Sequence, residues 1–148
     1  MIYTVGEMAK KIGVAPSTLR YYDKEGLLPF VERSNCGIRV FKEADYEWLK
    51  VIECLKKTGM PLKDIKTFIE MAMQGDETID ERLELIRKQR EEVGRQIAEL
   101  QETMDTLNFK CWYYETAKSA GTTAVPREMK LEELPEEFRE IRKKLRGE

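Results

Sequence analysis

The chain has 148 residues, the size of one domain with an extension, which excludes a large enzyme with separate cofactor and substrate domains. Charged residues make up 36% and hydrophobic residues 41% of it, a balance that predicts a folded, soluble protein and excludes a membrane protein or a disordered chain. The sequence contains no His, the commonest general base and metal ligand, so an enzymatic function is not expected.

Charge and cysteine usage narrow the function classes further. The net charge of −2 hides an asymmetry, because residues 1–42 carry 7 basic and 4 acidic side chains (+3) and residues 76–148 carry 14 and 18 (−4). No stretch reaches the roughly 18 apolar residues that cross a bilayer, so we expect a cytoplasmic protein with no membrane partner. The three cysteines lack CxxC spacing, so we expect no disulfide framework, no metal site and no cofactor.

The first part of the chain has the pattern of a helix-turn-helix. Thr4 and Glu7 are spaced as a capping box, which predicts a short first helix. Gly13 marks a tight turn, and Pro16 suits the first turn of a second helix that ends before Gly26. Small and apolar side chains are spaced to pack these two helices together, as a helix-turn-helix requires.

A hairpin and two longer helices are expected next. The turn-rich run at 33–37 lies between two apolar stretches, which predicts a small hairpin with an exposed tip. A third helix is predicted at about 43–58, with acidic residues in its first turn and lysines in its last, as the helix dipole favours. A fourth helix is predicted from Pro61 to about Gln74.

From Thr78 the apolar residues follow a strict alternation of four and three, which predicts a coiled-coil helix over 76–118. Thr78 and Glu81 have the spacing of a second capping box at its start. At 1.5 Å per residue the seam from Ile79 to Tyr114 would be roughly 54 Å long, too long to be buried on the small domain that precedes it, so a second copy of the chain is implied. The positions of this seam are Ile79, Leu83, Ile86, Arg90, Val93, Ile97, Leu100, Met104, Leu107, Cys111 and Tyr114.

The last part of the chain again has helical periodicity. Apolar residues between Leu131 and Leu145 predict a short helix that either docks on the dimer or shapes an effector site. The aromatic run 109–114 is expected to pack on the partner's head, or else to line an effector pocket. The predicted organisation is therefore a helix-turn-helix domain at 1–75, a dimerisation helix at 76–118 and a tail at 119–148.

The second helix and the hairpin carry the side chains that favour double-stranded DNA. Arg and Lys neutralise phosphates, and Ser, Thr and Tyr hydroxyls bond phosphate oxygens or base edges in the major groove. A merely solvated helix face is the simpler alternative, but the preceding turn and the basic hairpin favour a recognition helix and a wing that reaches the phosphate backbone. The predicted DNA-binding residues are Ser17, Thr18, Arg20, Tyr21, Tyr22, Lys24, Arg33 and Arg39.

These motifs together resemble the MerR family of transcriptional regulators. The resemblance covers about residues 2–118 and rests on TVGEMAKKIGVAPSTLRYYDKEGLL, the wing RSNCGIRVF, the segment CLKKTGMPLKDIK and the long helix. It implies a mainly α fold, with winged helix-turn-helix heads joined by an antiparallel coiled coil in a homodimer. It also implies binding to a near-palindromic promoter operator, which is distorted in response to an effector so that RNA polymerase can engage.

Within that family the chain looks similar to the NmlR/AdhR-like branch, which responds to aldehydes and other electrophiles and carries one cysteine in the helix after the wing. Cys54 matches that position, and Lys50 and Lys57 would share its helix face and favour the nucleophilic thiolate. Three alternatives stay open: packing of Cys54 as a small hydrophobe, sensing of a small organic ligand where the coiled coil meets the heads and tail, and a coiled-coil protein-interaction module.

Overall fold

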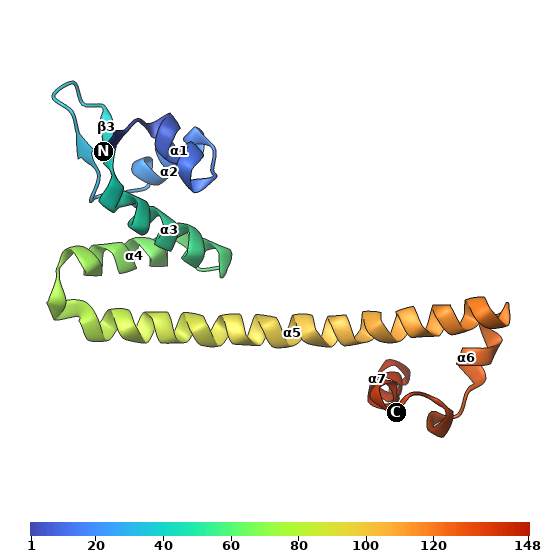
Figure 1. The fold of residues 1–148 in the computed structure, drawn as a ribbon. Coiled ribbons are helices and arrows are strands. Elements are labelled where there is room, and N and C mark those ends of the chain that lie inside the picture. Colours follow the sequence, from blue (N-terminus) through green and yellow to red (C-terminus); the bar gives the residue numbers. More distant parts are fainter. The chain divides into compact units, whose positions relative to one another are not determined.

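A computed structural model describes residues 1–148 as seven α-helices, two short 3-10 helices and three strands (Figure 1). The chain divides into two compact units, residues 1–93 and residues 94–148, and each is described by itself. One helix, α5, runs from Ile79 to Ala120 and contributes to both units. The mainly α fold expected from the sequence is confirmed, and none of the helices is both long and apolar enough to cross a membrane.

Helices α1 (Val5–Ile12) and α2 (Pro16–Lys24) form the predicted helix-turn-helix. The Glu7 amide donates to the Thr4 hydroxyl (3.3 Å) and the Thr4 amide donates to the Glu7 carboxylate (2.8 Å), which confirms the first capping box. The hydrogen bond from the Thr4 amide also lowers the pKa of Glu7. Gly13 ends α1 with φ +81°, a left-handed conformation that glycine adopts without a Cβ penalty.

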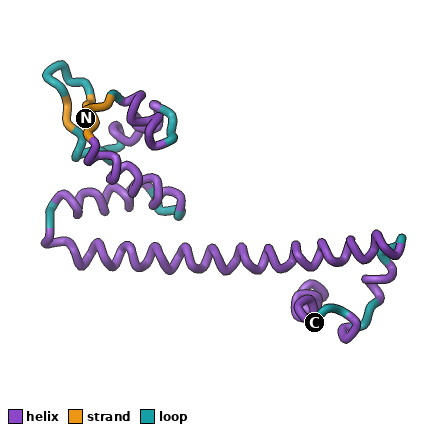
Figure 2. The backbone as a smooth tube through the Cα atoms, viewed as in Figure 1, coloured by secondary structure: helices purple, strands orange, loops and turns teal.

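A three-stranded antiparallel sheet packs beside these helices, with the order β1-β3-β2. Strands β2 (Glu32–Arg33) and β3 (Arg39–Lys42) form the predicted hairpin, and Arg33 lies directly opposite Arg39. Strand β1 (Ile2–Tyr3) pairs with the other edge of β3 (Figure 2). Strand β1 was not predicted, because two residues are too few to show the alternation that marks a strand.

Helices α3 (Glu43–Lys57) and α4 (Leu62–Met73) complete the head and agree with the predicted ranges within one or two residues. The Asp45 carboxylate accepts from the Lys42 amide (2.8 Å) at the start of α3, and Pro61 immediately precedes α4. The head has one apolar core to which the helices, the hairpin and the connecting loops all contribute. Its buried residues are Met8, Ala9, Ile12, Leu19, Tyr22, Leu27, Leu28, Val31, Phe41, Leu49, Ile52, Leu55, Met60, Ile65, Phe68 and Ile69.

The capping box predicted at Thr78 is not formed. A 3-10 turn (Asp76–Thr78) leads directly into α5 and buries Thr78 against the end of α4. The Thr78 hydroxyl therefore donates to the Met71 carbonyl (2.5 Å) and accepts from Arg82 Nε (3.1 Å). The sequence shows the correct spacing for a box, but it does not show that the preceding helix offers Thr78 a carbonyl acceptor.

The start of α5 belongs to the head. Leu85 packs against the apolar core, and Gln89 Nε2 donates to the Thr58 hydroxyl (2.5 Å) at the end of α3. The long helix therefore begins as a structural part of the head. Its contact with Thr58 would transmit a conformational change in α3 directly to α5.

In the second unit, helix α7 (Glu136–Arg146) packs on the later part of α5, after the short helix α6 (Ala124–Glu128). The Phe138 ring lies 5.7 Å from the Phe109 ring and 5.6 Å from the Trp112 ring, measured between centroids. The predicted tail helix exists, but Phe109 and Trp112 pack on their own chain's α7. Phe109 is only 5% exposed, so the expectation that it packs on a partner's head is wrong, whereas for the half-buried Trp112 this expectation stays a prediction.

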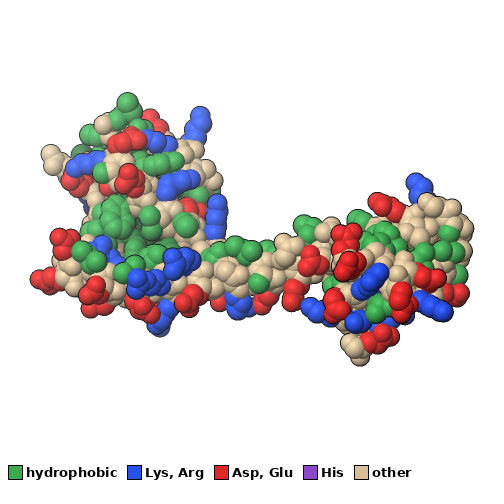
Figure 3. Space-filling model, turned by 60° about the horizontal axis from the view of Figure 1, so that its bottom comes forward, with side chains coloured by type: hydrophobic (Ala, Val, Ile, Leu, Met, Phe, Trp, Pro, Cys, Tyr) green, Lys and Arg blue, Asp and Glu red, His purple; other side chains and the backbone are tan.

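The seam of α5 stays exposed in the single chain. Ile97 and Leu100 keep 62% and 69% of their surface open to solvent. With Met104 at heptad position a, Phe109 falls at position f, which faces away from the seam. Helix α7 therefore covers the opposite side of α5, and hydrophobic side chains remain visible among the charged ones along this helix (Figure 3).

Candidate nucleic-acid interface

One face of α2 is free to meet a partner. Ser17, Arg20, Tyr21 and Lys24 recur at helical spacing and are all exposed, so they form one surface, which we call the recognition face. Arg20 makes no hydrogen bond or ion pair within the chain, and Tyr21 is 48% exposed. Thr18, also predicted to bind DNA, is half-buried at the side of this face. An unpaired guanidinium beside hydroxyl groups suits phosphate oxygens and the acceptor edges of bases.

Tyr22 was predicted to contact DNA, and its position corrects that prediction. Its ring is 1% exposed, its hydroxyl donates to Glu53 Oε1 (2.6 Å), and Lys56 Nζ donates back to the hydroxyl (3.0 Å). Burial, with the hydrogen bond to Glu53, raises the pKa of Tyr22, so the phenol stays protonated and remains a donor. Successive helical residues point about 100° apart, so Tyr21 faces outward and Tyr22 ties the recognition helix to α3.

We expect Tyr22→Phe to lower the free energy of unfolding by about 1–2 kcal/mol, because a partly buried Glu53 loses its donor. Affinity for operator DNA should stay within about twofold, since the hydroxyl faces the core. Urea unfolding and DNA titration, both at one protomer concentration, measure the two effects. A large loss of DNA affinity at unchanged stability would instead indicate that Tyr22 contacts DNA.

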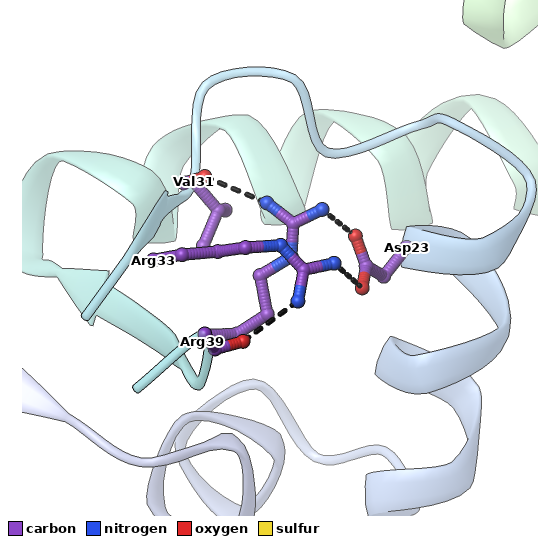
Figure 4. A network of polar contacts seen from close by, with 5 residues as sticks. Asp23, Val31, Arg33 and Arg39 are labelled. Carbon is purple, nitrogen blue, oxygen red and sulfur yellow. Dashed lines mark hydrogen bonds and ion pairs between the residues drawn. The ribbon is translucent and has the colours of Figure 1, made fainter. Parts of the chain in front are cut away.

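The two wing arginines converge on one carboxylate from the recognition helix, Asp23 (Figure 4). Arg33 Nη2 donates to Asp23 Oδ2 (3.3 Å) and its Nη1 donates to the Gly37 carbonyl (2.8 Å). Arg39 forms an ion pair with Asp23 Oδ1, and its Nη1 donates to the Val31 carbonyl (2.8 Å). The predicted phosphate-binding arginines are thus already paired in the free chain. The sequence shows a basic hairpin, but it does not show that Asp23 on α2 lies opposite both arginines.

The candidate sensor Cys54 lies on α3 with its thiol exposed. Exposure is contrary to the alternative in which Cys54 packs as a small hydrophobe. Lys50, expected to favour the thiolate, places its ammonium 5.9 Å from the Tyr46 ring centroid, on the preceding turn of the helix. No interaction joins Lys50 or Lys57 to the sulfur, so a sensing role for Cys54 stays a prediction.

Comparison with known proteins decides the family. Residues 3–72 match the family described as MerR HTH family regulatory protein, and residues 46–108 match the one described as MerR, DNA binding. The chain is 47% identical over 136 residues to an uncharacterised HTH-type transcriptional regulator of Haemophilus influenzae, and the match covers 92% of this chain and 98% of that protein. The chain belongs to the MerR family. It is therefore a DNA-binding transcriptional regulator and not an enzyme.

Solved structures agree with this MerR assignment. The chain is similar to HiNmlR, described as a MerR family regulator lacking the sensor domain, bound to promoter DNA. The TM-score is 0.76 at 49% identity, covering 84% of this chain and 99% of that one. A second match, a MerR family regulator of Listeria monocytogenes, has a TM-score of 0.74 at 30% identity and covers 80% of this chain and 90% of that one. The winged helix-turn-helix with a long coiled-coil helix and the NmlR-like resemblance are thereby confirmed.

Proposed function

We propose that this MerR-type regulator acts as a homodimer in the cytoplasm, where it binds a near-palindromic operator inside a promoter. The observation that carries the proposal is the exposed seam of α5, which a second copy of the same helix would cover. Two chains joined in this way present two recognition faces, one for each half-site of the operator. An effector then changes the shape of the bound DNA, and RNA polymerase engages the promoter.

An antiparallel arrangement of the two α5 helices suits the seam. The seam runs from Ile79 to Tyr114, so its midpoint lies between Val93 and Ile97, and Leu100 of one chain meets the region of Val93 of the other. Each fully buried Leu or Ile contributes about 1.5–3 kcal/mol, so the seam offers ample free energy for association. Because α7 lies on the far side of α5, it does not compete for this surface.

We further propose that Cys54 senses an electrophile such as an aldehyde, or an oxidant. In the aldehyde reaction the thiol first loses its proton to solvent, and the thiolate sulfur then forms a bond to the carbonyl carbon. The π bond of the carbonyl breaks, and its oxygen takes a proton from solvent, so the product is a hemithioacetal. Two observations support this site: the thiol is exposed, and its neighbour Glu53 on α3 bonds Tyr22 of the recognition helix. A new group on Cys54 would therefore lie beside a contact that holds the recognition helix.

A second candidate is a non-covalent small organic ligand. A groove of about 390 Å³ between α5 and α7 in the second unit favours it. Both apolar and charged side chains line the groove, which would suit an amphipathic ligand. The lining residues are Asp105, Asn108, Glu137, Phe138, Glu140, Ile141 and Lys144.

Run-off transcription from a promoter bound by the protein tests both candidates. Wild type, Cys54→Ser and the control Cys36→Ser are each compared with and without a reactive aldehyde. We expect the aldehyde to induce transcription with wild type and Cys36→Ser but not with Cys54→Ser, because Ser at that position is a far weaker nucleophile. Equal induction in all three would contradict a sensing role for Cys54. If a small organic ligand induces transcription instead, and Phe138→Ala weakens that induction, the result would favour the groove as the effector site.

A further inference from the structure

The carboxylate that joins the wing to the recognition helix has no role in the function described so far. We propose that Asp23 determines DNA specificity: it fixes the wing to α2, so that Arg33 meets a phosphate only when the recognition face is in register with its site. The proposal depends on DNA binding by the head alone, and not on the effector or on the dimer.

The two arginines held by Asp23 have different roles. The Arg39 side chain is only 20% exposed, and it bridges Asp23 to the Val31 carbonyl. Arg39 is therefore an internal strut between the hairpin and the helix. The Arg33 side chain is 52% exposed and uses two of the five N–H donors of its guanidinium, for Asp23 and Gly37. Its other donors are available to a phosphate, in an orientation that Asp23 sets.

Two neighbouring residues of α2 join this helix to two different elements, α3 and the hairpin. Tyr22 faces α3 and bonds Glu53, and Asp23 faces the wing. Because Arg33 and Arg39 are directly opposite each other in the β2–β3 register, both side chains reach the same side of the hairpin and the same carboxylate. The recognition helix is thereby fixed to the core by one residue and to the wing by the next.

The charge of Asp23 has different expected effects on the affinity for all DNA and on the preference for the operator. A negative charge at a surface that meets phosphates weakens binding to every DNA sequence. If the same charge orients Arg33 for the correct register, it strengthens binding to the operator more than binding to other DNA. Asp23 then raises the ratio of specific to non-specific affinity, the quantity that selects a site in a genome.

The test compares Asp23→Asn with wild type on an operator duplex and on a scrambled duplex of equal length, over a range of salt concentrations. We expect affinity for the scrambled duplex to rise about threefold to tenfold, because a repulsive charge is lost. Operator affinity should not rise with it, so the ratio of operator affinity to scrambled-duplex affinity should fall by about the same threefold to tenfold. The control is Glu25→Gln, which removes an exposed charge one residue beyond α2 that contacts neither arginine. It should raise both affinities equally.

Equal increases on both duplexes for Asp23→Asn, as in the control, would overturn the proposal. Arg33→Ala provides an independent test, because this half-exposed side chain lies outside the core. Arg33→Ala should lower operator affinity, and it should lower the salt dependence of binding by about one ion per head. In a protein that already carries Arg33→Ala, Asp23→Asn should no longer change the specificity ratio. An Arg33→Ala variant with wild-type operator affinity and salt dependence would equally refute the assignment. Thermal unfolding confirms that each variant is folded.

Discussion

We expect Leu100→Asp to convert the proposed dimer into monomers and to lower operator affinity about 100-fold or more. Leu100 is 69% exposed in the single chain, so the substitution leaves the folding of each chain intact. In the dimer, each copy would place an unpaired carboxylate in an apolar seam, which costs several kcal/mol. A 100-fold loss corresponds to about 2.7 kcal/mol. Light scattering after gel filtration measures the mass, and titration of operator DNA measures the affinity.

Ala98→Asp is the matched control for this substitution. Ala98 is exposed two residues earlier on α5, at a heptad position that faces away from the seam. The same charge there should leave the protein dimeric and its operator affinity within about threefold of wild type. A Leu100→Asp protein that stays dimeric would disprove the coiled-coil dimer, since a buried seam cannot hold two extra charges without separating.

The elements that the sequence predicted are those with local causes. The Thr4–Glu7 box, the positive φ of Gly13 and the proline at the first turn of α2 each act within a few residues, and each is found as expected. The long helix followed from the alternation of four and three over many turns, a pattern that only a helix with one apolar stripe satisfies. Such signals depend on no distant part of the chain.

The features that the sequence did not reveal depend on contacts between distant segments. Tyr21 and Tyr22 are chemically equivalent candidates, and only the packing of α2 on α3 turns one outward and the other toward Glu53. Asp23 was not among the predicted site residues, because only the hairpin register brings two arginines to it. Phe109 looked like a contact for a partner, but α7 returns to cover it. The sequence of a single helix or strand does not show which distant residues its side chains will contact.

We expect Arg20→Ala to remove most of the DNA affinity and to leave the fold unchanged. Arg20 is exposed, has no partner within the chain and lies in the middle of the recognition face, so no folded contact is lost with it. A bidentate contact from one arginine discriminates by about 1–3 kcal/mol, and the proposed dimer uses two of them, which predicts an operator affinity at least about 30-fold weaker. Lys63→Ala removes an exposed charge from α4 instead of α2 and should change affinity by less than about threefold.

The pattern of the loss identifies what Arg20 contacts. If its guanidinium reads a base edge, Arg20→Ala weakens operator binding far more than binding to scrambled DNA, and Arg20→Lys is nearly as damaging because the planar fork is lost. If it meets a phosphate, both duplexes lose affinity equally, the salt dependence falls by about one ion per head, and Arg20→Lys restores most of the binding. The exposed position of Arg20 between Ser17 and Lys24 on the recognition face favours the base edge, because a recognition helix presents this face to the major groove. Wild-type affinity in Arg20→Ala would mean that α2 is not the recognition helix.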